Sequence, residues 1–142
     1  MRICDILRRK GFEVVTIAPD RTVLDAVQTL VEHNIGAVVV VDGSGLAGIL
    51  SERDVLRLTA QSTDLSTLRV GDVMTSDVVI GDGSDNLREV MDVMTRNRIR
   101  HLPVVDGGNL AGLVSIGDLV NALRTAVETE NRHLKQYIAG AS

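Results

Sequence analysis

One pattern occurs twice in this sequence, and the duplication constrains the fold more than any other feature. Residues 40–43, with the sequence VVDG, recur at 104–107, and residues 46–48, LAG, recur at 110–112. Both matches have a spacing of 64 positions, so the similarity continues without a gap. Self-similarity at a fixed spacing indicates that one supersecondary unit is built twice. We therefore expect two tandem copies of one fold.

The hydrophobic pattern changes in the same order within each copy. Short β-branched runs at 14–16 and 78–80 predict strands. Apolar residues at helical spacing follow at 23–31 and 87–94 and predict amphipathic helices. The residues that start these helices are typical of capping pairs, Thr22 with Asp25 and Asn86 with Glu89.

Two apolar runs complete each copy before a second helix begins. Glycine-containing segments at 42–45 and 106–109 separate the runs and predict hairpin turns. A second helix is expected to begin near Ser51 and near Ser115. Each half therefore has the order strand, helix, strand, strand, helix, which places the fold in a mixed α/β (α+β) class.

The halves are expected to fold together, because a unit with three short strands and two helices cannot cover its own helix faces. We expect two pseudo-symmetric β-α-β-β-α repeats packed as one module, at 1–64 and 65–125, with a helical tail at 126–142.

Upstream of the strands, DIL at 5–7 resembles DVM at 72–74 at a spacing of 67, so the first copy has three extra residues, which we place at 8–10.

The tail extends an apolar stripe that begins within the second repeat. Its members recur near helical spacing and predict a long C-terminal helix. They are Leu119, Leu123, Val127, Leu134 and Ile138. This stripe packs either against its own module or against a second chain.

Composition excludes several functional classes. The chain has 142 residues, a net charge of -4, and only Phe12 and Tyr137 as aromatics, so no basic stripe or stacking platform for nucleic acid is present. The sequence contains no run of about 18 apolar residues, so it predicts no membrane span. Its first residues lack the apolar stretch of a signal peptide, and we therefore expect a cytoplasmic protein. With Cys4 as the single cysteine, neither an internal disulfide nor a cysteine-rich metal site can form. The three histidines show no metal-ligand spacing with carboxylates.

Two segments carry a resemblance to a known family. Residues 48–54, GILSERD, and 112–118, GLVSIGD, resemble the G-x-x-[ST]-x-x-D ending of CBS (cystathionine β-synthase) domains. DVMT at 72–75 is similar to the opening of a second CBS domain, and RIRHLPV at 98–104 is similar to its middle strand. The resemblance covers residues 1 to 125. It identifies the chain as similar to a stand-alone tandem CBS pair, or Bateman module.

This resemblance implies a function as well as a fold. CBS pairs form two pseudo-symmetric clefts between their repeats, where adenosine-containing ligands such as AMP, ADP, ATP, NAD or S-adenosylmethionine bind. Such pairs act as sensors and tend to form homodimers, which favours the second chain as the partner of the tail. No barrel, channel or kinase sequence is attached here, so the effector is expected to be a separate protein.

The serine and aspartate of each motif suit a nucleotide for physical reasons. Ser51 and Ser115 lie where a strand passes into a helix, so free amides and the positive end of the helix dipole favour an anion. Asp54 and Asp118, one turn later, can accept hydrogen bonds from both hydroxyls of a ribose. The simpler interpretation is that both pairs are capping boxes. The two roles are compatible.

The adenine ring of such a ligand must lie between aliphatic side chains, because aromatic side chains are nearly absent. For each aliphatic residue assigned to a cleft below, ordinary packing in the hydrophobic core is the alternative interpretation. The first cleft is assigned Thr16, Ile17, Ile35, Gly36, Ala37, Val38, Ser51, Arg53 and Asp54. The second cleft is assigned Met74, Thr75, Ile80, Arg98, Ile99, Arg100, His101, Leu102, Pro103, Ser115, Gly117 and Asp118.

The two copies supply positive charge differently. Arg53 serves the first, whereas Arg98, Arg100 and His101 serve the second, and Gly117 stands where Arg53 would recur. The clefts are therefore expected to differ in ligand preference, unless these arginines are simply solvated.

The expected function is a nucleotide-sensing regulatory module that performs no reaction. A ligand-free scaffold or dimerisation module is the first alternative. An enzyme acting on a nucleotide is the second, but no activated nucleophile, paired-carboxylate site or phosphate-cradling G-x-x-x-x-G-K-[ST] loop is visible.

Overall fold

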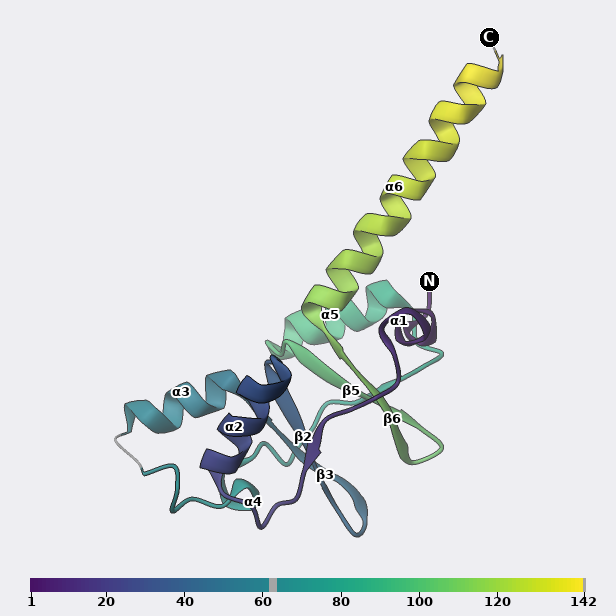
Figure 1. Cartoon of the computed structure of the whole chain (residues 1–142). Helices are drawn as coiled ribbons and strands as arrows, with labels where there is room; N and C mark the ends of the chain where they lie inside the picture. The colour runs from purple at the N-terminus through teal and green to yellow at the C-terminus, as the bar shows by residue number, and fades with distance from the viewer. Residues whose placement is uncertain (62–63, 142) are drawn as a thin grey trace.

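A computed structural model describes residues 1–61 and 64–141 and contains two small sheets, each with its own helices (Figure 1). The elements in chain order are α1 (Ile3–Lys10), β1 (Thr16–Ile17), α2 (Val23–His33), β2 (Ala37–Asp42), β3 (Gly45–Ser51), α3 (Glu52–Ala60), α4 (Val70–Val73), β4 (Gly81–Asp82), α5 (Leu87–Asn97), β5 (His101–Asp106), β6 (Asn109–Ser115) and α6 (Ile116–Ala141).

The two sheets have the same topology, which confirms the mixed class and the repeated order of elements. One sheet has the order β1-β2-β3 and the other β4-β5-β6. In each, the first strand pairs in parallel with the second, and the second pairs antiparallel with the third. The parallel pairs are joined through α2 and α5, as a crossover connection requires. The sheets approach each other along β3 and β6.

The hairpins follow the duplication in detail. Each ladder has an irregularity at the same place, between Val40 and Val41 and between Val104 and Val105. Gly45 at φ 109° and Gly107 at φ 57° hold the turns in backbone conformations that favour glycine.

The first strand of each repeat is shorter and lies later than the β-branched runs predict. The ladders contain 16–17 and 81–82 rather than 14–16 and 78–80. Val15 and Val79 instead pack their side chains against the two cores. In both repeats, the β-branched run therefore indicates an extended segment whose side chains contact the core, and not a strand paired in the sheet.

The expected cap of α2 is confirmed, whereas at α5 only the first of the two expected capping residues forms a cap. At α2 the Asp25 amide donates to Thr22 Oγ1 at 3.1 Å, and the Thr22 amide donates to Asp25 Oδ2 at 3.2 Å. At α5 the Asn86 side chain accepts from the amide of Arg88 at 2.9 Å, and Glu89 completes no capping box. The short Asn86 side chain turns to the nearer amide, so Glu89 stays on the exposed face of the helix.

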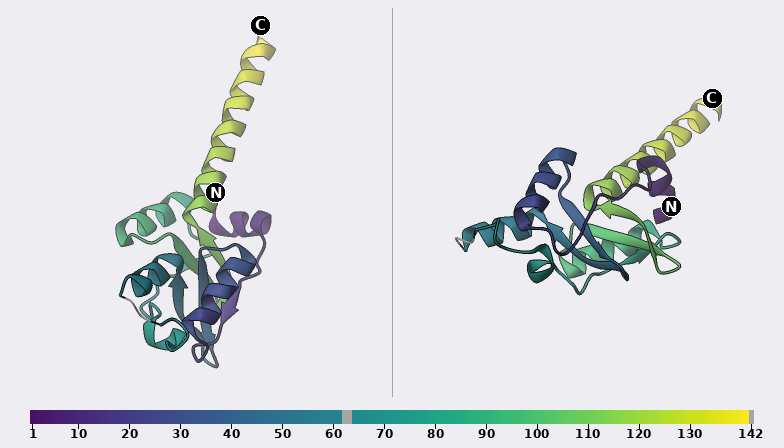
Figure 2. Two further views of the ribbon diagram at one scale, coloured as in Figure 1. Left: turned by 60° about the vertical axis from the view of Figure 1, so that its left-hand side comes forward. Right: turned by 60° about the horizontal axis from the view of Figure 1, so that its bottom comes forward.

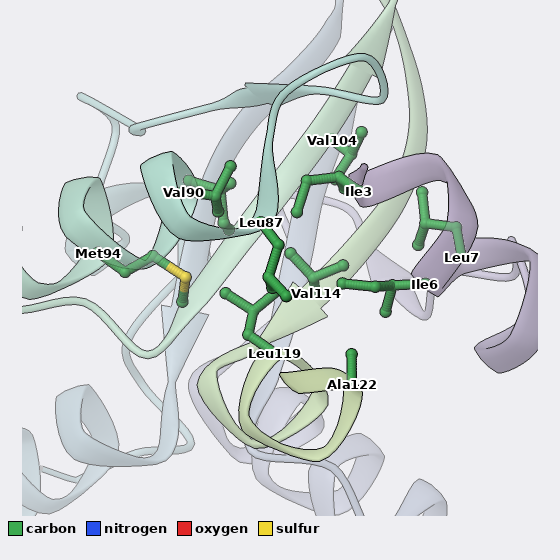
Figure 3. Close-up of a cluster of buried hydrophobic side chains, with 11 residues drawn as sticks. Ile3, Ile6, Leu7, Leu87, Val90, Met94, Val104, Val114, Leu119 and Ala122 are labelled. Carbon is green, nitrogen blue, oxygen red and sulfur yellow. The ribbon is translucent and has the colours of Figure 1, made fainter. Parts of the chain in front are cut away.

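The sequence patterns do not predict α1 and α4, which open the two copies and exchange places in the fold. The core of the second sheet includes Ile3, Ile6 and Leu7 of α1, as Figure 3 shows. The core of the first sheet includes Val70 of α4. Each copy is therefore completed by the helix that precedes the other copy.

Backbone hydrogen bonds hold both exchanged helices in equivalent positions. The amide of Ile3 donates to the carbonyl of Asp85 at 3.0 Å, and the amide of Val70 donates to the carbonyl of Arg21 at 2.8 Å. Because each repeat is completed by a segment of the other, the two repeats form one packed module.

Two glycines allow the exchanged segments to approach the sheets. A Cβ on Gly48 would lie 2.5 Å from Met74 Sδ and 2.7 Å from the carbonyl oxygen of Thr75, and one on Gly112 would lie 2.7 Å from Leu7 Cδ2. Gly48→Ala is therefore expected to lower the free energy of unfolding by about 1 to 3 kcal/mol, as overpacking does. Urea denaturation tests this, with Gly43→Ala as the control, because a Cβ there meets nothing within 4 Å. Equal stability of both variants would contradict the close approach.

The long C-terminal helix is confirmed, and α6 projects far beyond the sheets (Figures 1 and 2). Its apolar stripe is buried at Leu119 but becomes exposed further on, with 45% exposure at Val127 and 67% at Ile138. The homodimer stays a prediction. Among the described helices, none combines the length and apolarity that crossing a bilayer requires.

Candidate functional site

A cavity of about 250 Å³ lies between the two repeats. The end of β3 and the start of α3 form one side, and the segment between α5 and β5 forms the other. Its volume lies just below the range of about 300 to 1,000 Å³ for small-molecule pockets. The lining residues are Gly36, Ile49, Ser51, Glu52, Arg53, Asp54, Arg57, Thr75, Arg98, Ile99, Arg100 and His101.

Asp54 is held rigidly at the start of α3. Its Oδ2 accepts from the Ser51 amide at 2.9 Å and from the Ser51 hydroxyl at 3.0 Å, while Ser51 Oγ accepts from the Asp54 amide at 3.3 Å. The other oxygen, Oδ1, has Arg57 Nη1 at 3.8 Å. Asp54 therefore caps the helix with Oδ2, while Oδ1 lies outside the cap and within ion-pair distance of Arg57.

Positive charge surrounds this carboxylate from both repeats. Arg53 and Arg57 come from α3, and Arg98 and Arg100 come from the opposite wall. Four guanidinium groups face two carboxylates, those of Glu52 and Asp54, so the cavity has a net positive charge. Such a cavity favours an anionic ligand.

Arg98 occupies a strained backbone position at the cavity wall. It ends α5 with φ 53°, a left-handed conformation, and the corresponding residue of the first repeat is Asn34 at φ 52°. Asparagine tolerates this conformation more readily than arginine does. Strained residues of this kind cluster at binding and catalytic sites.

His101 lies where the two repeats come closest. A Cβ on Gly36 would be 3.1 Å from His101 Nε2 and 3.3 Å from Glu52 Oε1, so any larger residue there would push these side chains aside by a few tenths of an ångström. Desolvation by burial lowers the pKa of His101 below its usual value, and the charge of Lys10 lowers it further, against the opposing charges of Glu52 and Asp118. The imidazole is therefore neutral at neutral pH.

The cavity combines residues that the sequence assigned to two different clefts. Four come from the first set, Gly36, Ser51, Arg53 and Asp54, and five from the second set, Thr75, Arg98, Ile99, Arg100 and His101. The cavity therefore draws on both assigned sets: one copy supplies the serine and aspartate, and the other supplies much of the opposite wall. The assignment of these residues to a ligand stays a prediction. The cavity forms across the contact between the repeats, so two segments distant in the sequence line its opposite sides.

The remaining assigned residues lie elsewhere. Ile17, Ala37, Val38, Leu102 and Pro103 are buried in the strands, and Met74 packs against the first core. Thr16 and Ile80 are exposed, and Ile35 lines an apolar groove between α2 and α3. The buried residues of this set therefore agree with the alternative interpretation, in which they are ordinary core residues. Ser115, Gly117 and Asp118 stand at the start of α6, apart from the cavity.

Asp118 forms the same cap as Asp54 but also an ion pair. The Ser115 amide donates to Asp118 Oδ2 at 2.8 Å, and Lys10 Nζ donates to the same oxygen at 2.6 Å. Burial raises the pKa of Asp118, but the hydrogen bonds from Lys10 and Ser115 outweigh it, so the net pKa lies below the usual carboxyl value. Both carboxylates are therefore ion-paired, Asp118 through its capping oxygen Oδ2 with Lys10 and Asp54 through Oδ1 with Arg57.

Sequence reasoning missed three cavity residues, Ile49, Glu52 and Arg57. Arg57 is three positions after Asp54, on the same face of α3, and helical spacing from Asp54 would have found it. Ile49 lies one residue from Gly48 on β3, and strand alternation would have placed it on the opposite face from Leu50.

The CBS domain family model matches residues 3–60 and 70–125. The chain therefore belongs to the CBS domain family and contains two such domains. It is 37% identical over 148 residues to the mitochondrial CBS domain-containing protein CBSX3 of Arabidopsis thaliana, covering 97% of this chain and 72% of that protein. It is 40% identical over 108 residues to the CBS domain-containing protein YhcV of Bacillus subtilis, covering 75% and 76%.

Solved structures agree with this assignment. The CBS-domain containing protein ATU1752 from Agrobacterium tumefaciens superposes with a TM-score of 0.82 at 40% identity, covering 86% of this chain and 98% of that chain. The CBS domain pair of protein MJ0100, solved in complex with 5′-methylthioadenosine and S-adenosylmethionine, superposes with a TM-score of 0.77 at 25% identity, covering 87% and 99%. The family thus includes pairs that bind adenosine-containing ligands.

Proposed function

We propose that this chain is a cytoplasmic nucleotide-sensing regulatory module that binds an adenosine-containing ligand in the cavity between its repeats. One observation carries the proposal: Asp54, whose Oδ1 lies outside the helix cap and 3.8 Å from Arg57 Nη1, shares one cavity with four arginines. A carboxylate suits the two hydroxyls of a ribose, and guanidinium groups suit a phosphate. The half-buried Ile49 and Ile99 in the same lining supply aliphatic surface for a base.

The charge of the cavity favours some adenosine ligands over others. A phosphate gains from the guanidinium groups, whereas the sulfonium of S-adenosylmethionine is repelled by them. The proposal therefore ranks AMP, ADP, ATP and NAD above S-adenosylmethionine for this chain. MJ0100, which was solved with S-adenosylmethionine, is only 25% identical, so a different preference is compatible with the shared fold.

The module is proposed to act by binding and not by catalysis. The Ser51 hydroxyl donates to Asp54 Oδ2 and accepts from the Asp54 amide, so both of its hydrogen-bonding roles serve the cap of α3. Occupancy of a cavity between two repeats favours one relative placement of those repeats, and so changes the surface offered to a separate effector protein. The exposed stripe of α6 supports a homodimer within the same proposal.

A thermal-shift screen tests the proposed function. AMP, ADP, ATP and NAD are each added at increasing concentration, with S-adenosylmethionine as the cationic comparison. A ligand at 100 times its dissociation constant is expected to stabilise the fold by about 2.7 kcal/mol. No stabilisation by any of them would favour the ligand-free scaffold, and conversion of the ligand during incubation would favour the enzyme.

Binding of AMP is expected to depend on pH through His101. The free module holds this imidazole neutral, and a nearby phosphate favours the protonated form, so binding takes up a proton. Affinity should therefore rise about 2- to 5-fold between pH 7.5 and pH 6.0, relative to a variant without the imidazole. Calorimetry on the wild type and on His101→Gln measures this difference, because the phosphate's own titration near pH 6 is common to both. Identical pH profiles would contradict the role of His101.

A further inference from the structure

We infer that Arg98 binds the phosphate of the ligand, and that this residue makes the cavity distinguish a nucleotide from its nucleoside. The inference rests on the proposed function and assigns the phosphate contact to one side chain. The four arginines that line the cavity are Arg53, Arg57, Arg98 and Arg100. Their surroundings differ, and the differences single out Arg98.

The other three arginines have a second environment besides the cavity. Arg57 Nη1 lies 3.8 Å from Asp54 Oδ1, so this guanidinium already faces a carboxylate. Arg53 and Arg100 also line the apolar groove between α2 and α3, which places them at the border between groove and cavity. Arg98 lines the cavity and not the groove. It is exposed and forms no ion pair with any residue of 1–61 or 64–141, so its charge is available to a ligand.

The backbone of Arg98 has a conformation that arginine disfavours. Arg98 ends α5 at φ 53° and ψ 43°, and Asn34, 64 positions earlier, ends α2 at φ 52° and ψ 51°. Among the described residues, these two are the non-glycine residues with a positive φ. Asparagine adopts this left-handed conformation at little cost, whereas a longer side chain raises its energy. Asparagine would therefore suit the backbone at position 98 better than arginine does.

Residues on both sides hold Arg98 in this conformation. Its amide donates to the carbonyl of Thr95 at 3.2 Å, which closes the end of α5. The amide of the next residue, Ile99, donates to the carbonyl of Met94 at 3.0 Å, and Ile99 packs against the second core. The helix end and the core thus fix the point from which the Arg98 side chain extends. Arginine here adds strain and forms no ion pair in the free module, which is the pattern expected of a ligand-binding residue.

Calorimetry with AMP and with adenosine, at one pH and one salt concentration, tests the inference. Arg98→Asn is expected to weaken AMP binding by about 10-fold, because a charge-assisted contact is lost, and to leave adenosine binding unchanged. The urea midpoint of the same variant should rise by about 0.2 to 0.5 M, because asparagine suits the left-handed backbone. Arg98→Lys keeps both the charge and the strain, so it should retain more AMP affinity than Arg98→Asn and gain no stability.

Arg96→Asn is the matched control. Arg96 also lies on α5 but outside the cavity, and its Nε donates to the carbonyl of Asp92 at 3.4 Å. This substitution removes the same charge from the module. It should therefore bind AMP as the wild type does and should not raise the urea midpoint.

The outcomes separate this inference from the proposed function. If Arg98→Asn binds AMP as tightly as Arg96→Asn does, or loses affinity for AMP and adenosine equally, Arg98 does not bind the phosphate, and nucleotide binding itself is unaffected. A urea midpoint lower in Arg98→Asn than in the wild type would overturn the argument from strain. If the wild type binds neither AMP nor adenosine, the proposed function fails, and this inference fails with it.

Discussion

Asp54→Asn is expected to weaken AMP binding by about 10- to 100-fold. A charge-assisted hydrogen bond contributes roughly 1.5 to 3 kcal/mol, and every 1.4 kcal/mol is a factor of ten in affinity. Asparagine keeps an oxygen that can accept from the Ser51 amide, so the cap of α3 is largely retained. The loss is then assigned to the ribose contact and not to unfolding. Isothermal titration calorimetry at fixed salt measures it.

A matched control separates capping from binding. Asp25 caps α2 in the same way, with its Oδ2 accepting from the Thr22 amide, and it lies outside the cavity. Asp25→Asn should therefore bind AMP as the wild type does, although it also gives up the Arg21 ion pair at 3.0 Å. If Asp54→Asn binds AMP as tightly as Asp25→Asn does, Asp54 does not hold the ribose.

Leu7→Ala is expected to lower the free energy of unfolding by about 2 to 5 kcal/mol, the range for a leucine deleted from a core. Leu7 is 1% exposed and packs with the residues of the second core, although it belongs to the helix that opens the first copy. Its side chain also fills the space over Gly112. Urea denaturation measures the loss, and hydrogen exchange locates it. Exchange should accelerate at β6 more than at β3.

Leu56→Ala provides the comparison for this prediction. Leu56 is 70% exposed, so its removal should change stability by less than about 0.5 kcal/mol, as surface substitutions do. A loss in Leu7→Ala that is equally small, or faster exchange confined to β3, would show that α1 does not complete the second core.

Much of the fold follows from local patterns. The duplication at a spacing of 64, the glycine turns and the helical spacing of the apolar residues predict both sheets, α2, α5 and the long C-terminal helix. The exchange of α1 and α4 is not predictable in this way. Helices of eight and four residues are too short to show which partner they cover, and DIL at 5–7 has the same pattern wherever it packs. Tertiary contact decides between the two cores.

The candidate site shows the same division between local and long-range information. The capping geometry of Ser51 with Asp54 was predictable, because both residues lie within one helical turn. The presence of Arg98 and Arg100 in the same cavity as Asp54 was not, since it depends on which faces of the two repeats meet. The ion pair of Asp118 with Lys10 was not predictable either, because the two residues are 108 positions apart in the chain.

A crystal structure of the chain grown with AMP tests the central claim most directly. The account predicts the two ribose hydroxyls on the carboxylate of Asp54, with the phosphate among the arginines of the same cavity. AMP bound away from this cavity, or an empty cavity in crystals grown at saturating AMP, would contradict it.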